Sequence, residues 1–261
     1  MSTPKAGIAA ALDGCYTAME ALCADLTAAE WQAQSLCPDW TVRDVVDHVT
    51  GIEAAMVDWL PDDDRTPPPF QRAADFSRDA GNGAAYLDTV HAVYDRRRRD
   101  LAALSPADFE RPSWTPVGSG SYGRYLAIRV FDLWVHERDI TTPLGRPTDD
   151  TGVAAEIALA EVENSIGYIV GKKVGLPDGA SISFHLTGPI VRQLNVAVDR
   201  RAQRVDHLDH PDVTVTTDSS TFIQLACGRI DPQLPIDSGA LSWSGDPALG
   251  ERAARNLRFT M

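Results

Sequence analysis

Lysines, cysteines and long hydrophobic runs are scarce in this sequence of 261 residues. Only three lysines are present, so arginine carries nearly all of the positive charge. The four cysteines, Cys15, Cys23, Cys37 and Cys227, form no Cys-x-x-Cys pair. This pattern favours free thiols in a reducing compartment over a disulfide framework.

No hydrophobic run approaches the length of a membrane span, and the first ten residues lack the apolar core of a signal peptide. We therefore expect a cytoplasmic protein. Acidic residues outnumber basic ones by 37 to 24, for a formal net charge of −13. Such a charge would repel nucleic acid and anionic membranes, so we expect neither as a partner. The length and the 44% hydrophobic content are typical of a globular chain with two domains.

Hydrophobic periodicity predicts four helices in the first half of the chain. Thr41 and Asp44 form a capping-box pattern at the start of the second. The acidic, proline-rich stretch 61–69 and the Gly- and Pro-rich stretch 105–122 are predicted loops, the latter a flexible lip beside a pocket. Four helices with such connections favour an antiparallel bundle, which we assign to residues 1–147. The predicted helices cover residues 5–31, 42–60, 82–104 and 124–140.

The helix predicted at 124–140 is apolar on almost every side, which is typical of a buried helix. One polar stripe interrupts it, because Tyr125, Arg129, Asp132 and His136 follow one another at spacings of three or four. A buried carboxylate and imidazole need a partner, and a divalent metal would be one. The alternative is a structural cluster in which Arg129 pairs with Asp132.

A third candidate ligand, His48, lies on the apolar face of the helix predicted at 42–60. The bundle would bring it to the same interior as Asp132 and His136. Two histidines and one carboxylate leave an open position on zinc, as in catalytic sites, although non-haem iron uses the same ligands. The four arginines at 96–99 are predicted to form a solvated face rather than an anion site.

The second half of the chain predicts an α+β module, which we assign with its linking helix to residues 148–261. Alternating and β-branched residues indicate strands, and 3.6-residue periodicity indicates helices. His207 and His210 flank Asp209 in a predicted surface turn. The predicted strands are 181–187, 190–198, 213–216 and 241–243, and the helices are 151–170, 221–227 and 246–257.

Two distinctive segments contain the candidate histidine ligands, Cys37-Pro-Asp-Trp-Thr-Val-Arg-Asp-Val-Val-Asp-His48 and Phe131-Asp-Leu-Trp-Val-His-Glu-Arg-Asp-Ile140. These two segments resemble the signature sequences of mycothiol-dependent maleylpyruvate isomerase-like proteins. The resemblance implies a DinB-like metal-binding helical bundle followed by a small domain similar to sterol carrier proteins. It places the family's metal ligands on His48, Asp132 and His136. Asp132 replaces the family's Glu and is one methylene shorter.

The resemblance implies an enzyme that uses a divalent metal, with zinc expected, and mycothiol. The partners would be this low-molecular-weight thiol and a small electrophile. Thiolate addition followed by elimination gives isomerisation, and addition alone gives S-transfer. Arg129 is predicted to hold a substrate carboxylate or to pair with Asp132, and Tyr125 to orient the substrate. The alternatives are a non-catalytic small-molecule or lipid-binding module and a metal-dependent hydrolase.

Overall fold

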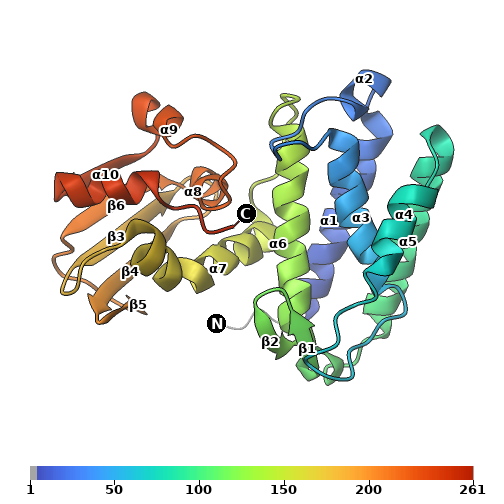
Figure 1. The fold of residues 1–261 in the computed structure, drawn as a ribbon, viewed down its shortest axis with the longest axis horizontal. Helices are drawn as coiled ribbons and strands as arrows, with labels where there is room; N and C mark the ends of the chain where they lie inside the picture. Colours follow the sequence, from blue (N-terminus) through green and yellow to red (C-terminus); the bar gives the residue numbers. More distant parts are fainter. Residues whose placement is uncertain (1–4, 261) are drawn as a thin grey trace. The chain divides into compact units, whose positions relative to one another are not determined.

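The computed structural model describes residues 5–260, and the chain divides into two compact units between Thr148 and Asp149. The first unit is helical and the second combines a β-sheet with helices (Figure 1). The predicted fold class, a helical bundle followed by an α+β module, is therefore confirmed. Among the described residues, every helix is too short or too polar to cross a bilayer.

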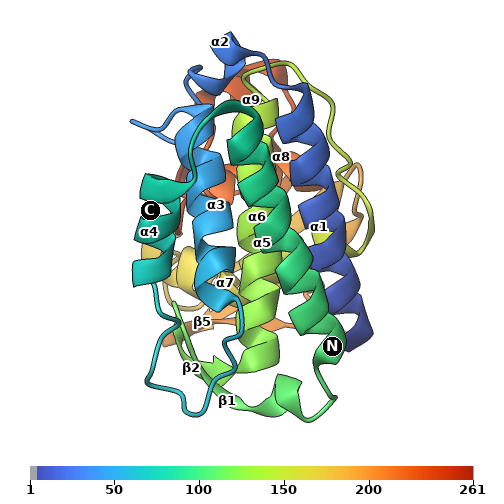
Figure 2. The ribbon, with the colours of Figure 1, turned by 90° about the vertical axis from the view of Figure 1, so that its right-hand side faces the viewer.

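Four long helices form the bundle of the first unit. Helix α1 packs against α5 and α6, and α3 packs against the same two helices, so the four enclose a common interior (Figure 2). Two shorter helices, α2 and α4, complete the helices of the described part of this unit. The bounds are α1 (Lys5–Asp25), α2 (Ala28–Trp31), α3 (Val42–Met56), α4 (Gln71–Asp79), α5 (Gly83–Ala103) and α6 (Tyr122–Thr141).

Capping residues set where these helices begin. The predicted capping box is confirmed, because the Thr41 side chain accepts from the Asp44 backbone N–H while the Asp44 carboxylate accepts from Thr41 N at 2.8 Å. The single helix predicted over 5–31 is wrong. A second capping box, between Thr27 and Glu30, starts the separate helix α2.

Helix α4 was not predicted, and it changes the direction of the chain. The chain runs down α3, returns along α4 and then runs down α5, so α3 and α5 have the same direction (Figure 2). The expected antiparallel order thus holds only when α4 is counted. Gly51 permits the close contact between α3 and α4, since a Cβ at Gly51 would lie 3.2 Å from the carbonyl oxygen of Ala73. Only Phe76 of α4 is buried, and the helix contains few apolar residues.

The stretch 105–122 is not the loop that we expected. It holds a short 3-10 turn, Asp108–Glu110, and an antiparallel hairpin formed by β1 (Pro112–Thr115) and β2 (Gly118–Ser121). Trp114 of β1 makes edge contacts with the rings of Phe70 and Tyr125. This hairpin closes the end of the bundle at which α6 begins (Figure 2).

The second unit is built on a five-stranded sheet in the order β5-β4-β3-β6-β7. Strands β3 and β6 are parallel, and the other neighbouring pairs are antiparallel. Strand β5 and helix α9 were not predicted. The bounds are α7 (Gly152–Tyr168), which continues as a π-helical turn (Ile169–Val174), β3 (Ser181–Thr187), β4 (Arg192–Asp199), β5 (Arg201–Val205), β6 (Val213–Asp218), α8 (Ser219–Ala226), α9 (Gln233–Ser238), β7 (Ser242–Gly245) and α10 (Pro247–Arg255).

The two faces of this sheet differ in polarity. On one face, Phe184 pairs in register with Leu194 and Val215, all three are fully buried, and the Phe184 ring lies 5.4 Å from that of Phe222 on α8. On the other face, Ser183 pairs with Asn195 and its hydroxyl donates to the Asn195 side-chain oxygen at 2.8 Å. The apolar face therefore supplies the core of the second unit.

Candidate metal centre

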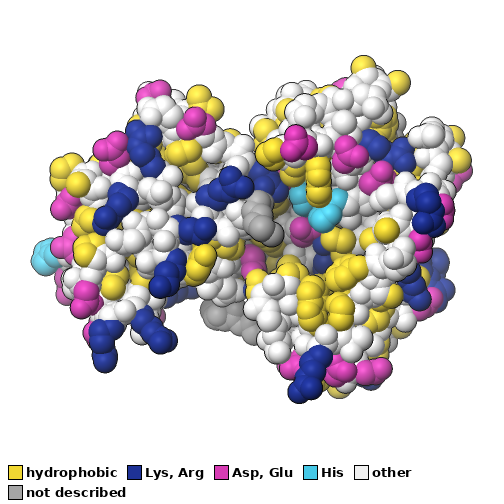
Figure 3. All heavy atoms as spheres, in the orientation of Figure 1, with side chains coloured by type: hydrophobic (Ala, Val, Ile, Leu, Met, Phe, Trp, Pro, Cys, Tyr) yellow, Lys and Arg dark blue, Asp and Glu magenta, His cyan; other side chains and the backbone are white. Residues whose placement is uncertain are grey.

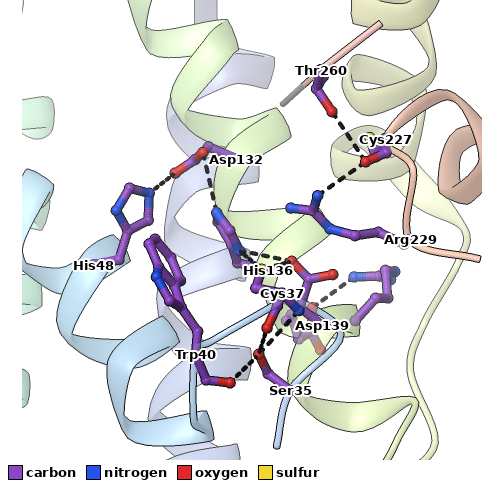
Figure 4. Close-up of polar contacts among 12 residues, drawn as sticks. Ser35, Cys37, Trp40, His48, Asp132, His136, Asp139, Cys227, Arg229 and Thr260 are labelled. Carbon is purple, nitrogen blue, oxygen red and sulfur yellow. Dashed lines mark hydrogen bonds and ion pairs between the residues drawn. The ribbon is translucent and has the colours of Figure 1, made fainter. Parts of the chain in front are cut away.

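Three predicted metal ligands converge in the interior of the bundle (Figure 4). His48 comes from α3, and Asp132 and His136 come from successive turns of α6. The Nε2 atom of His48 lies 3.7 Å from Asp132 Oδ2, and Nε2 of His136 lies 3.5 Å from Asp132 Oδ1. One ligand atom from each residue lies within 4.8 Å of the others. The structure thus brings together the three side chains that the sequence singled out.

The donor set and its spacing fit a divalent metal. Zinc bonds to imidazole nitrogen and carboxylate oxygen are about 2.0–2.2 Å long, so ligands of a tetrahedral site lie about 3.3–3.6 Å apart. Each histidine has one Asp132 oxygen near this spacing, Oδ1 at 3.5 Å from His136 and Oδ2 at 3.7 Å from His48, and one ligand atom from each of the three residues lies within 4.8 Å of the others. Three protein ligands would leave one tetrahedral position for a further ligand.

A second carboxylate orients His136. Its Nδ1 lies 2.8 Å from Asp139 Oδ2 and donates to it, so Nε2 is the nitrogen that faces Asp132 and the one that would give up its proton to a bound metal. A carboxylate on the outer nitrogen of a histidine is the usual support of a metal-bound imidazole. Burial opposes the charged imidazole, but Asp132 and Asp139 together raise the pKa of His136 well above its ordinary value.

Asp139 was missed by the sequence analysis, as was its contact with Cys37. The Cys37 thiol donates to Asp139 Oδ2 at 3.1 Å and lies 3.8 Å from His136 Nδ1. Cys37, His136 and Asp139 therefore form a second group of three potential ligands, all buried. A signal was present, because Asp139 follows His136 by three residues and so shares its helix face.

Asp132 is held by Arg129, as one of the two interpretations of the sequence proposed. Arg129 Nη1 donates to Asp132 Oδ2 at 2.6 Å. Burial opposes ionisation of Asp132, but the guanidinium of Arg129 and the imidazole of His136 hold its pKa well below the ordinary value. Asp132 is therefore an anion, the form that binds a metal.

Arg129 belongs to a buried network that also contains Glu53. The Glu53 carboxylate accepts from Arg129 Nε at 2.8 Å, from Arg97 Nε at 2.9 Å and from the Tyr16 hydroxyl at 2.6 Å. Burial alone would raise the pKa of Glu53, but Arg129 and Arg97 keep it below the ordinary value. Four helices, α1, α3, α5 and α6, contribute one residue each to this network.

The expectation that residues 96–99 form a solvated face is wrong at Arg97, whose side chain has no exposed surface. It points inward because it continues the buried stripe of α5 that contains Tyr94 and Leu101, at spacings of three and four. Its buried charge is matched by Glu53, with which it forms an ion pair of 2.9 Å. The spacing was visible in the sequence, but the neighbouring arginines obscured it.

Tyr125 lies seven residues before Asp132 on α6 and is buried. Its ring makes edge contacts with Trp59 and Trp114, at centroid distances of 5.9 and 6.1 Å. Burial raises the pKa of its hydroxyl above the ordinary value, so the hydroxyl is protonated at neutral pH. The catalytic role of Tyr125 stays a prediction.

Trp40 covers the two imidazoles, with its ring centroid 4.9 Å from that of His48 and 6.1 Å from that of His136. Beside it lies a pocket of about 500 Å³ between α3 and α4, to which His48 contributes one wall. The His48 side chain is 32% exposed and that of His136 only 8%, so the centre is more exposed at His48 than at His136. Histidine is visible at the surface of the helical unit, next to hydrophobic side chains (Figure 3).

Comparison with known proteins agrees with this architecture. Residues 12–141 match the family described as the mycothiol maleylpyruvate isomerase N-terminal domain, and residues 156–252 match the MDMPI C-terminal domain. No match is found among curated proteins.

Two similar solved structures are those of the mycothiol-dependent maleylpyruvate isomerase and of a histidine-to-alanine mutant of it. Both are 17% identical to this chain, with TM-scores of 0.62 and 0.63, and each alignment covers 93% of both chains. At this identity the likeness shows the fold. Together with the two domain matches, which cover most of the sequence in the same order, it establishes that the chain belongs to the mycothiol-dependent maleylpyruvate isomerase family.

Proposed function

We propose that this protein is a mycothiol-dependent isomerase of a small electrophilic substrate, and that it works at a zinc site formed by His48, Asp132 and His136. The observation that carries the proposal is the convergence of two Nε2 atoms and one ionised carboxylate, with Asp139 orienting the ring of His136. The family supports the use of mycothiol and the isomerase class.

A zinc ion bound by these residues would hold the sulfur of mycothiol as a thiolate at neutral pH, and so would supply the nucleophile. The protein residues define where that sulfur can lie. Asp132 and His136 are on one helix, His48 is on another, and the ring of Trp40 covers both imidazoles. The sulfur would therefore approach from the more exposed His48 side.

Isomerisation needs no protein nucleophile. A bound thiolate would supply reversible addition to one carbon of the substrate's conjugated double bond, so that rotation about the resulting single bond and expulsion of the thiolate would give the isomer. Mycothiol is regenerated, so no oxidant or reductant is consumed.

The prediction that Arg129 holds a substrate carboxylate gains no support from its contacts. Its Nε, Nη1 and Nη2 donate to Glu53, Asp132 and the Val49 carbonyl respectively. We infer that Arg129 acts on the centre through Asp132. Tyr125 lies near the start of α6 and contacts Trp59 and Trp114. It stays a proposed substrate-orienting residue.

Metal content and thiol dependence test the proposal together. The purified protein is expected to hold about one zinc ion per chain. The His48→Ala and His136→Ala variants should lose it, whereas the control His207→Ala, at an exposed histidine paired with Asp209, should retain it. Isomerisation of maleylpyruvate or a related unsaturated diacid should require mycothiol and disappear in the two metal-site variants.

The same experiment distinguishes the alternatives. Turnover of an ester or amide without added thiol would indicate a metal hydrolase. Accumulation of a thiol–substrate conjugate without isomer would indicate S-transfer. A folded protein without metal, unchanged in His48→Ala, would reject the zinc site and leave a small-molecule or lipid-binding module.

A further inference from the structure

Glu53 is the shared hydrogen-bond acceptor of the buried network next to the metal centre. Its side chain has no exposed surface, and both of its carboxylate oxygens are engaged. Oε2 accepts from Tyr16 and Arg97, and Oε1 accepts from Arg129. Any rotation of this carboxylate would leave a buried charge without its partner, which is costly in a medium of low dielectric constant. Glu53 therefore has one well-defined orientation.

Arg129 connects Glu53 to the candidate metal centre, because it binds both Glu53 and Asp132. Its guanidinium contacts α3 at two points, through Nε to Glu53 Oε1 and through Nη2 to the Val49 carbonyl oxygen at 3.3 Å. Val49 directly follows His48, so the second contact fixes the helical turn that carries this ligand. The third contact, of 2.6 Å from Nη1 to Asp132 Oδ2, fixes the rotation of the Asp132 carboxylate on α6.

The geometry of these contacts goes beyond charge neutralisation. The planar guanidinium presents several N–H donors in a rigid fork, so one group can bind two carboxylates and a carbonyl at once. A lysine would carry the same charge on a single nitrogen and could not span the three acceptors. The arrangement in which Asp132 Oδ1 faces His136 and Oδ2 lies near His48 depends on this fork.

On the basis of the function proposed above, we propose that Glu53 and Arg129 are positioning residues of the metal centre. They hold the carboxylate of Asp132 and the His48 turn of α3 at the separation that three ligands of one cation require. Neither residue would be a ligand of the cation. A substitution that keeps the charge of either residue but loses its hydrogen bonds should therefore weaken metal binding, because His48 and Asp132 must then be brought into place before they can bind.

The test uses the full-length protein and two charge-conserving variants, Arg129→Lys and Glu53→Asp. The matched control is Arg98→Lys, because Arg98 on α5 also binds several acidic side chains, including Glu20 at 2.8 Å and Asp13 at 2.6 Å, but has no contact with the three ligands. Zinc affinity is measured for each metal-free protein by competition with a chromophoric chelator. Circular dichroism and thermal unfolding of the same samples report the fold.

We expect zinc affinity to fall about 10- to 100-fold in Arg129→Lys and Glu53→Asp, the range typical of residues that orient metal ligands, and to change less than about twofold in Arg98→Lys. The visible spectrum of the cobalt-loaded variants should also shift, because the ligand geometry changes. Wild-type affinity and an unchanged spectrum in folded Arg129→Lys would overturn the proposal.

Unfolding of both charge-conserving variants would also overturn it, since the network would then serve the fold and not the ligands. The outcome separates this proposal from the function on which it rests. If the wild-type protein binds zinc and the variants bind it equally well, only the positioning role fails. If the wild-type protein binds no zinc, the metal site itself fails.

Discussion

Replacing Asp139 should weaken metal binding although Asp139 is not one of the three proposed ligands. Its carboxylate accepts from Nδ1 of His136 at 2.8 Å, so it directs Nε2 at Asp132 and favours the neutral tautomer whose one proton is on Nδ1. In Asp139→Ala this orientation and this tautomer preference are lost, so the tautomer with its proton on Nε2 competes with the metal. Loss of such a partner typically costs about 10- to 100-fold in metal affinity, or about 1.4–2.8 kcal/mol.

The assay is zinc competition with a chromophoric chelator, and Cys37→Ser provides the matched comparison. Serine keeps a donor toward Asp139 Oδ2, which Cys37 contacts at 3.1 Å. If His48, Asp132 and His136 hold the metal, Cys37→Ser should change the affinity by less than about threefold, well below the effect of the alanine variant. A larger loss in Cys37→Ser than in Asp139→Ala would refute this reasoning, since it would assign the metal to the group of Cys37, His136 and Asp139.

Three further predictions concern stability and reactivity. Burial raises the pKa of the Cys15 and Cys23 thiols to about 12, so Ellman's reagent at pH 8 should modify them only after unfolding in guanidinium; fast modification in the native state would contradict their burial. The folded-state pKa of Glu53 is lowered, so its ionised form stabilises the fold fully above the unfolded pKa of about 4.3 and less as the pH falls through the folded pKa. The difference in the free energy of unfolding between wild type and Glu53→Gln, measured by urea titration, should therefore shrink below about pH 4, and a constant difference would contradict the shift. Thr41→Ala removes the side-chain cap of α3 and should lower the free energy of unfolding by about 1 kcal/mol in the same titration. An unchanged free energy of unfolding would show that Asp44 alone is enough to cap α3.

The sequence predicted site residues where a polar side chain interrupts an apolar helical pattern. Asp132 and His136 were recognisable because they interrupt an otherwise apolar helix at a spacing of four, and His48 because it lies on an apolar face. The capping box of Thr41 and Asp44 was also visible, since it depends on residues three positions apart. Such local patterns need no knowledge of the rest of the fold.

The partners of these residues were not predictable, because they depend on which helices are neighbours. Glu53 and Arg129 are 76 positions apart, and Glu53 and Arg97 are 44 apart. Helix α4 was also missed, since it is short, mostly polar and buries only Phe76. Without α4, the parallel course of α3 and α5, which places Arg97 against Glu53, could not be derived.

The coordination of zinc in the protein without thiol is the most direct test of the proposed centre. Zinc-edge X-ray absorption of the stoichiometrically loaded protein should show nitrogen and oxygen ligands at about 2.0–2.2 Å, with two imidazole contributions from His48 and His136. No sulfur should be present until mycothiol is added, when one sulfur at about 2.3 Å should appear. A sulfur ligand before mycothiol is added, or fewer than two imidazoles, would contradict the assignment.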